Sequence, residues 1–212
     1  WNIRQFKKHG IVQFFINLHY LPDVIRDYCG DGSRWGVKIT YSYEPNIIGT
    51  AGGVKNFEAA LDDVFFLIYG DTISLVDYTK MADYFWTKPG AIGIERVART
   101  DDYQDADVAE LDTVGRFTAV HAKPHSFRYS RAYRMRGVFI LRRRILSLVP
   151  AGERYEIGNQ LLPKAVKLGE QFYGYECEGY SKGIDTVEKW REVEEHLEMV
   201  RQAHHKKGKN RG

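Results

Sequence analysis

The chain has 212 residues, of which 43% are hydrophobic and 28% are charged. This is the composition of a globular protein, so we expect a packed core and not a disordered chain. No apolar run approaches the ~18–20 residues that cross a bilayer, and no signal peptide opens the chain. We therefore expect a cytoplasmic protein with no membrane partner. Cys29 and Cys177 are too few for a disulfide framework.

The net charge of +3 comes from the C-terminal end of the chain. Residues 201–212 carry five Lys and Arg side chains and no acid, so subtracting them from +3 leaves −2 on the other 200 residues. A nearly neutral body disfavours nucleic acid as a partner, because such a partner requires Lys and Arg clustered along an element. We interpret 203–212 as a basic flexible tail and 1–202, which no linker interrupts, as a single domain.

Helix and strand signals alternate over the first 70 residues. Residues 1–9 have the pattern of a helix that stops at Gly10, and 11–17 form a continuous apolar run typical of a strand buried on both faces. Next come a helix over about 21–29, a strand over 36–44, a glycine-rich turn at 49–53 with a helix after it to about Leu61, and a buried strand over 64–69. This succession predicts βαβ units.

From about residue 91 the pattern changes to short strands around turn signals, which predicts a β-hairpin excursion. The remaining expected elements are a buried strand over 136–142, helices over about 142–148 and 156–168, a strand over 171–176 and an amphipathic helix over 186–202. The predicted fold class is α/β: a Rossmann-like, open, mostly parallel sheet flanked by helices, with a small β-hairpin insertion.

Two carboxylates stand where ligands bind in open parallel sheets, beyond the ends of strands. Asp71 follows Gly70 at the end of a buried strand, and Asp185 lies between the last strand and the last helix. Such carboxylates suit Mg²⁺, which takes one or two of them together with phosphate oxygens and water. The alternative is helix capping, and Asp185 with Glu188 fits a capping box. If the two carboxylates converge, they can share one metal ion.

A glycine-rich turn, Gly49-Thr50-Ala51-Gly52-Gly53, precedes a predicted helix. Its glycines permit close backbone approach, and a helix N-terminus presents unpaired N–H groups to a base edge or a phosphate. The turn is not a Walker loop, because no Gly-Lys-Ser/Thr follows it.

The run EPNIIGTAGGVKNFEAALDDVFFLIYGDTI, with INLHYLPDVIRDYCGDGSRWGVKITYSYE before it, resembles the sugar-1-phosphate nucleotidyltransferases, or NDP-sugar pyrophosphorylases. Within that family it is closest in look to mannose-1-phosphate guanylyltransferases. The similarity extends to about Leu197, and GTAGG and YGD are its most specific segments. The resemblance implies transfer of NMP from a nucleoside triphosphate, with GTP favoured, to a sugar 1-phosphate. The products are an NDP-sugar and pyrophosphate, and the cofactor is Mg²⁺.

The resemblance also implies roles for individual residues. Asp71 and Asp185 match the metal-binding aspartates, and Lys123 matches the lysine that contacts the sugar phosphate, so these three form the implied catalytic set. Gly137 and Glu156 match positions that approach the sugar. The implied nucleotide-binding set is Gly49, Thr50, Ala51, Gly52, Gly53 and Gly70.

Two departures from the family pattern leave other interpretations open. Ala122 stands where the family has a glutamate before the lysine, and the 212 residues contain neither the N-terminal strand nor the Gly-x-Gly-Thr-Arg-Leu loop that cradles the triphosphate. The resemblance therefore implies that these residues alone have little or no activity. One alternative is a non-catalytic sugar-nucleotide-binding or regulatory homologue. Another is a metal-dependent glycosyltransferase, although the run 70–73 offers one acid where such enzymes need two. A homo-oligomer is compatible with the sequence.

Overall fold

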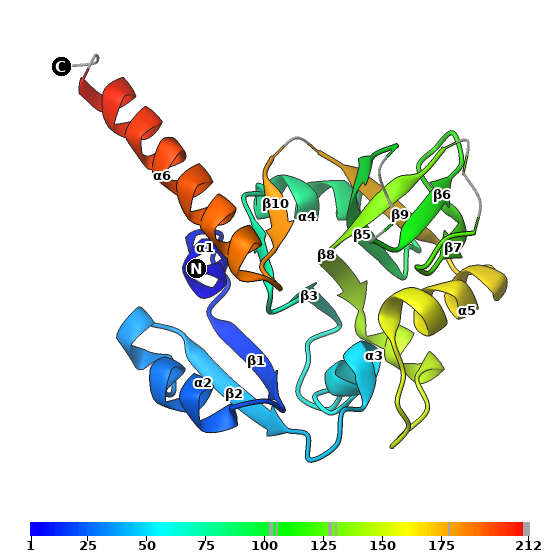
Figure 1. The fold of residues 1–212 in the computed structure, drawn as a ribbon. Helices are drawn as coiled ribbons and strands as arrows, with labels where there is room; N and C mark the ends of the chain where they lie inside the picture. The colour runs from blue at the N-terminus through cyan, green and yellow to red at the C-terminus, as the bar shows by residue number, and fades with distance from the viewer. Residues whose placement is uncertain (102–103, 105, 127–128, 130, 178, 210–212) are drawn as a thin grey trace.

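The computed structural model describes residues 1–101, 104, 106–126, 129, 131–177 and 179–209. Its N-terminal unit consists of helix α1 (Asn2–Lys8), strand β1 (Gln13–Leu18), helix α2 (Pro22–Cys29) and strand β2 (Lys38–Tyr43), with a single 3-10 turn at Ser33–Trp35. Strands β1 and β2 pair in parallel over six residues each. Figure 1 shows this unit beside the main sheet. The βαβ prediction for this region is confirmed.

The central sheet is organised around one long strand. Strand β8 (Tyr133–Arg142) runs antiparallel to β3 (Val64–Ile68), β5 (Gly93–Arg99) and β6 (Val108–Leu111). Strand β9 (Phe172–Glu176) pairs with β5 in parallel, and β7 (Phe117–His121) forms the expected hairpin with β6. The α/β class with a flanked central sheet is confirmed. The sheet is less parallel than expected, because β8 returns from the hairpin and enters between β3 and β5 in the opposite direction.

Shorter elements complete the fold. They are α3 (Gly49–Lys55), β4 (Thr72–Ser74), α4 (Tyr78–Trp86), a 3-10 helix at Arg143–Leu148, a π-helical turn at Ile157–Leu161, α5 (Leu162–Lys167), β10 (Ser181–Gly183) and α6 (Val187–Lys209). Two boundaries differ from the predictions. Helix α3 ends at Lys55 and not near 61, and α6 continues through 203–209, which we predicted as a flexible tail. That stretch contains no proline, so the helix can propagate once it has formed.

The core lies on both faces of the central sheet. Along β8, Phe139 and Leu141 pack into one cluster of buried residues, and Val138 and Ile140 pack into another on the opposite face. This alternation explains why the strand has no polar stripe in the sequence. Within the described residues, no helix has both the length and the apolarity that a membrane span requires.

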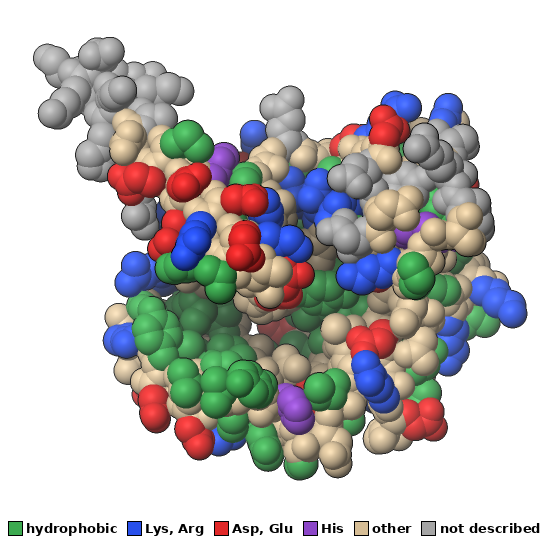
Figure 2. Space-filling model, in the orientation of Figure 1, with side chains coloured by type: hydrophobic (Ala, Val, Ile, Leu, Met, Phe, Trp, Pro, Cys, Tyr) green, Lys and Arg blue, Asp and Glu red, His purple; other side chains and the backbone are tan. Residues whose placement is uncertain are grey.

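Strands β1 and β3 each keep one open edge. Among the described residues, β1 pairs only with β2, and β3 pairs only with β8. Strand β3 has the wholly apolar sequence VFFLI, yet every one of its residues is only half-buried, and in β1 only Leu18 is buried. Figure 2 shows the surface hollowed near β1, with hydrophobic side chains gathered around the hollow. An apolar strand with unpaired backbone groups is a template for a further strand.

Candidate functional site

The two aspartates predicted to bind metal lie at one edge of a small antiparallel sheet. Asp71 immediately precedes β4, and Asp185 follows β10 by one residue. The two strands pair with Gly183 opposite Thr72, and the N–H of Ile184 donates to the carbonyl oxygen of Asp71 at 2.7 Å. Both aspartates are exposed. The structure therefore brings together two acidic residues that are 114 positions apart in the chain.

The capping alternative fails for both aspartates. Asp71 is followed by strand β4, and helix α4 is capped by Asp77. In the first turn of α6, the hydroxyl oxygen of Thr186 accepts from the N–H of Lys189 at 3.2 Å. Neither carboxylate is therefore occupied by a helix terminus.

Asp185 is held in its ionised form by neighbouring cations. The Nζ of Lys189 lies 2.8 Å from its Oδ1. The hydrogen bond from Lys189 lowers the pKa of Asp185 below its usual value against the small opposing effect of burial, and the charge of Lys123 acts in the same direction. Lys123, on the loop after β7, is exposed, and its backbone N–H donates to Oδ1 of Asp107 at 3.1 Å. Asp185 and Lys123 thus interact electrostatically, and the backbone of the β4–β10 pair places Asp71 beside Asp185.

Lys189→Ala is expected to move the pKa of Asp185 upward toward its ordinary value, because the variant removes the largest cause of the lowered pKa. Alanine preserves helix α6, since it is a strong helix former. A carboxyl-carbon NMR titration measures the change, and Lys167→Ala, an exposed lysine of α5, serves as the control. An unchanged titration of Asp185 in the first variant would contradict the assignment.

The glycine-rich turn differs from the expectation of unpaired donors. The N–H groups of Ala51 and Gly52 donate to the carbonyl oxygen of Tyr155 at 2.9 and 3.1 Å, and the N–H of Thr50 donates to Oε2 of Glu156 at 2.9 Å. The segment that contains Tyr155 and Glu156 crosses the start of α3 and satisfies these donors. The expectation that they are unpaired is therefore wrong for these three residues.

The glycines of this turn are required by the packing of the protein itself. Gly49 has a φ of +79°, and a Cβ at this position would lie 2.5 Å from the carbonyl oxygen of Tyr155. A Cβ on Gly53 would lie 2.6 Å from Oε1 of Glu44. A Cβ on Gly70 would meet nothing within 4 Å, so Gly70 borders open space next to Asp71. The nucleotide-binding role of these residues stays a prediction.

Glu156, which the resemblance assigns to a sugar hydroxyl, is engaged within the protein. Its Oε2 accepts from the hydroxyl of Thr50 at 2.9 Å, and its Oε1 lies 3.2 Å from the guanidinium of Arg154. Partial burial acts to raise the pKa of Glu156, but the hydrogen bonds from Thr50 and Arg154 outweigh it, and the net pKa is lowered. An anionic Glu156 ties the glycine-rich turn to the following π-helical turn.

Gly137 lies at a bulge between β8 and β5. Its φ is +65°, and its carbonyl oxygen accepts from the N–H of Tyr69 at 3.1 Å. The bulge frees the N–H groups of Arg136 and Gly137 from the ladder, and both donate to Oε1 of Glu95 at 3.1 Å. The predicted sugar-contacting glycine is therefore fixed by a carboxyl side chain that sequence reasoning missed.

Glu95 is a fully buried carboxyl group, with 0% of the residue exposed. Burial raises its pKa well above the usual value, against the opposing effect of the two backbone hydrogen bonds, and the nearby Asp107 raises it further. Its Oε2 has no partner within the described part of the chain. The sequence feature that could have identified Glu95 is its position as the single acid inside the run AIGIERVA.

Glu95→Gln is expected to alter how stability depends on pH. The folded-state pKa is raised, so the stability contributed by this carboxyl is complete below the unfolded value of ~4.3 and is lost as pH rises through the folded value. Between pH 4 and pH 8 the variant should gain more than ~1 kcal/mol in free energy of unfolding relative to the parent. Urea denaturation at both pH values measures this, with exposed Glu153→Gln as the control; parallel pH profiles would refute it.

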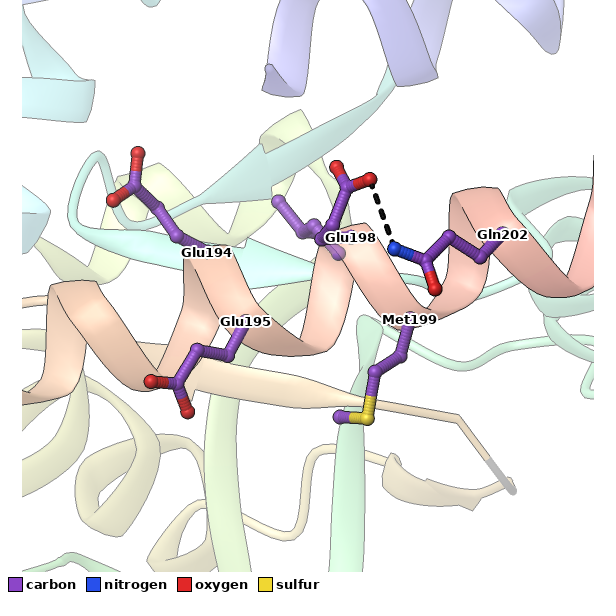
Figure 3. A pocket seen from close by; sticks show the side chains of 6 residues that line it. Glu194, Glu195, Glu198, Met199 and Gln202 are labelled. Atoms are coloured by element: carbon purple, nitrogen blue, oxygen red, sulfur yellow. Dashed lines mark hydrogen bonds between the residues drawn. The ribbon is translucent and has the colours of Figure 1, made fainter.

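The residues at the site fit a magnesium ion, because Mg²⁺ often takes only one or two ligands from the protein. Among the described residues no group of three or more His, Cys, Asp or Glu side chains could hold a metal by itself. Two exposed carboxylates at one strand edge meet the smaller requirement of Mg²⁺, which is completed by phosphate and water oxygens. A separate hollow of about 570 Å³ lies along α6, lined by Glu194, Glu195, Leu197, Glu198, Met199 and Gln202 (Figure 3). It contains none of the predicted site residues.

An α/β fold with two aspartates adjacent at strand ends agrees with the arrangement predicted for a nucleotidyltransferase, and comparison with known proteins agrees with this class. The chain belongs to the nucleotidyl transferase family, whose model matches residues 2–205. The resemblance to sugar-1-phosphate nucleotidyltransferases is thereby confirmed.

Individual relatives differ in the base they use. UTP–glucose-1-phosphate uridylyltransferase of Synechocystis is 30% identical over 181 residues, which cover 79% of this chain and 46% of that protein. Mannose-1-phosphate guanylyltransferase of Mycobacterium tuberculosis is 24% identical over 183 residues, covering 84% and 50%. The chain thus spans about half the length of these two curated relatives. The crystal structure of HddC from Yersinia pseudotuberculosis matches with a TM-score of 0.75 at 20% identity, covering 92% of this chain and 83% of that one, and supports the fold.

Proposed function

We propose that this chain acts as a sugar-1-phosphate nucleotidyltransferase domain, which transfers NMP from a nucleoside triphosphate to a sugar 1-phosphate and releases pyrophosphate. The backbone pairing that places Asp71 beside Asp185 at one strand edge, with the charge of Lys123 acting on Asp185, is the observation that carries this proposal, together with family membership. GTP is the favoured nucleotide donor, because of the sequence of the Gly49-to-Gly53 turn and the similarity to a guanylyltransferase. The similar uridylyltransferase makes UTP the competitor to test.

The proposed roles follow from charge and position. Asp71 and Asp185 would hold Mg²⁺, which when bound supplies charge neutralisation at the phosphate groups. Asp185 is ionised at neutral pH and is therefore ready to act as a ligand. Lys123 would orient the phosphate of the sugar substrate. Such a reaction needs no covalent intermediate, so positioning and charge are the protein's main contributions.

We further propose that the open edges of β1 and β3 receive the strand and Gly-x-Gly-Thr-Arg-Leu loop of the family pattern. Strand β3 is apolar and half-buried along its length, residues 14–16 of β1 are apolar and half-buried, and each strand has one partner among the described residues. A strand inserted there would join the β1–β2 pair to the central sheet. Its loop would add the cationic groups that balance the leaving pyrophosphate.

The test compares the 212-residue chain with a chimera that carries the corresponding N-terminal segment of the Synechocystis relative. The chimera should release pyrophosphate from a nucleoside triphosphate and a sugar 1-phosphate only when Mg²⁺ is present, and more quickly with GTP than with UTP. The unmodified chain should be at least about 10²-fold slower, because it lacks a whole set of charge stabilisers. A folded chimera that binds nucleotide but releases no pyrophosphate would favour a non-catalytic sugar-nucleotide-binding or regulatory role.

A further inference from the structure

A buried arginine lies on the face of β5 opposite to Glu95. Only 2% of Arg96 is exposed. One of its terminal nitrogens, Nη2, donates to the carbonyl oxygen of Gly179 at 2.5 Å, whereas Nε and Nη1 are buried with no partner in the part of the chain that the structure describes. Arginine stays protonated in proteins, and a buried charge that is unpaired is costly. Something outside the described residues must therefore compensate this guanidinium.

Two further buried donors lie beside it. Gly179 packs against the end of β4, where the N–H of Leu75 donates to the carbonyl oxygen of Tyr180 at 2.8 Å. The hydrogen bond to Gly179 therefore places the guanidinium of Arg96 near Leu75, the residue after Ser74. Ser74 is 0% exposed and its hydroxyl has no partner within the described residues; the same holds for the hydroxyl of Tyr78, which is 1% exposed.

The titration of Tyr78 supports this proximity. Burial raises the pKa of Tyr78 to about 12, while the adjacent Ser74 hydroxyl and the positive charge of Arg96 both act to lower it. Tyr78 is also the first residue of helix α4, whose N-terminal end adds positive potential. The carboxylate of Asp77 is directed elsewhere, since it accepts from the N–H of Lys80 at 3.1 Å.

We propose that Arg96, Ser74 and Tyr78 enclose a binding site for one small monovalent anion of the size of chloride. Each of the three groups can donate a hydrogen bond, because hydroxyl hydrogens rotate to suit a partner. When the adjacent hydroxyls of Ser74 and Tyr78 bond each other, one hydroxyl hydrogen and the Nε and Nη1 hydrogens of Arg96 still have no acceptor among the described residues. A single guanidinium balances a single negative charge. The anion would tie β5 to the end of β4 and to the turn before β10, which are the strands that carry Asp71 and Asp185.

The test is the dependence of thermal stability on the anion. At constant sodium concentration, replacing gluconate by chloride should raise the melting temperature of the 212-residue chain by about 4 °C when chloride exceeds its dissociation constant tenfold. Bromide should act in the same way. Ser74→Ala and Tyr78→Phe should each increase the chloride concentration needed for half of this rise by about tenfold, and Arg96→Met should abolish it. Exposed Ser147→Ala and Tyr20→Phe should leave it unchanged.

Any of three results would overturn the proposal even if Arg96→Met does not fold. One is an equal melting temperature of the parent chain in chloride, bromide and gluconate. Another is a chloride effect that appears only in Glu178→Gln, a position just before Gly179 that lies outside the described residues. In that case a carboxylate of the chain balances Arg96. Anomalous diffraction from a bromide-soaked crystal should show a peak beside the Arg96 guanidinium, and an empty position there would also reject the site.

Discussion

Asp71→Asn and Asp185→Asn are each expected to lower the rate of Mg²⁺-dependent pyrophosphate release by about 10²–10³-fold, the usual effect of removing one group that stabilises charge in a transition state. The two side chains lie at one edge of the β4–β10 pair, so each variant leaves a single carboxylate where Mg²⁺ is proposed to bind. Because the pair would act as a unit, the double variant should be little slower than either single variant. The measurement is steady-state kinetics in the chimera described above.

Asp27→Asn provides the control, since Asp27 is an exposed aspartate on α2. It changes the net charge by the same amount and should leave the rate unchanged. Circular dichroism establishes that each variant is folded. Parent-like turnover in both Asp71→Asn and Asp185→Asn would remove these residues from the reaction, whatever the family of the protein.

Gly137→Ala is expected to lower the free energy of unfolding by about 3 kcal/mol. Alanine is disfavoured by ~1–2 kcal/mol in the left-handed region, and the φ of Gly137 is +65°. In addition, a Cβ there would lie 2.5 Å from Cδ2 of the Tyr69 ring, which forces a repacking that typically costs ~1–3 kcal/mol. Tyr69 cannot simply move away, because its backbone N–H is bonded to the carbonyl oxygen of the same glycine.

Gly169→Ala separates these two contributions. Gly169 also has a positive φ, of +78°, but a Cβ at this position would meet nothing within 4 Å. This variant should lose only ~1–2 kcal/mol, so the difference between the two variants measures the steric contact with Tyr69. Guanidinium denaturation of both proteins gives the comparison. Equal losses would show that the bulge accommodates a methyl group and that Gly137 is not required by packing.

The sequence by itself determined the elements that leave a pattern of apolar residues along the chain. The apolar runs at 64–69 and 136–142 identified β3 and β8, because a strand covered on both faces has no polar side. The alternation of strands and helices up to residue 70 predicted the βαβ start. The position of Asp71 after a strand was also readable, and it is the reason that we predict a ligand-binding role for this carboxylate. These patterns involve residues that are close together in the chain, so they can be recognised without knowledge of the fold.

Only the tertiary structure decided which distant residues meet. Strands β4 and β10 have three residues each, too few for a periodic signal, yet their pairing places Asp71 beside Asp185. The direction of β8 depends on where the hairpin returns the chain. The N–H of Thr50 at the start of α3 donates to Glu156, 106 positions away, and the N–H groups of Ala51 and Gly52 donate to Tyr155. Glu95 accepts hydrogen bonds from the N–H groups of Arg136 and Gly137. These groups lie in a bulge, because β8 has more residues than β5 between the pairs Glu95–Phe139 and Val97–Met135. Each of these contacts depends on long-range packing, which no window of the sequence contains.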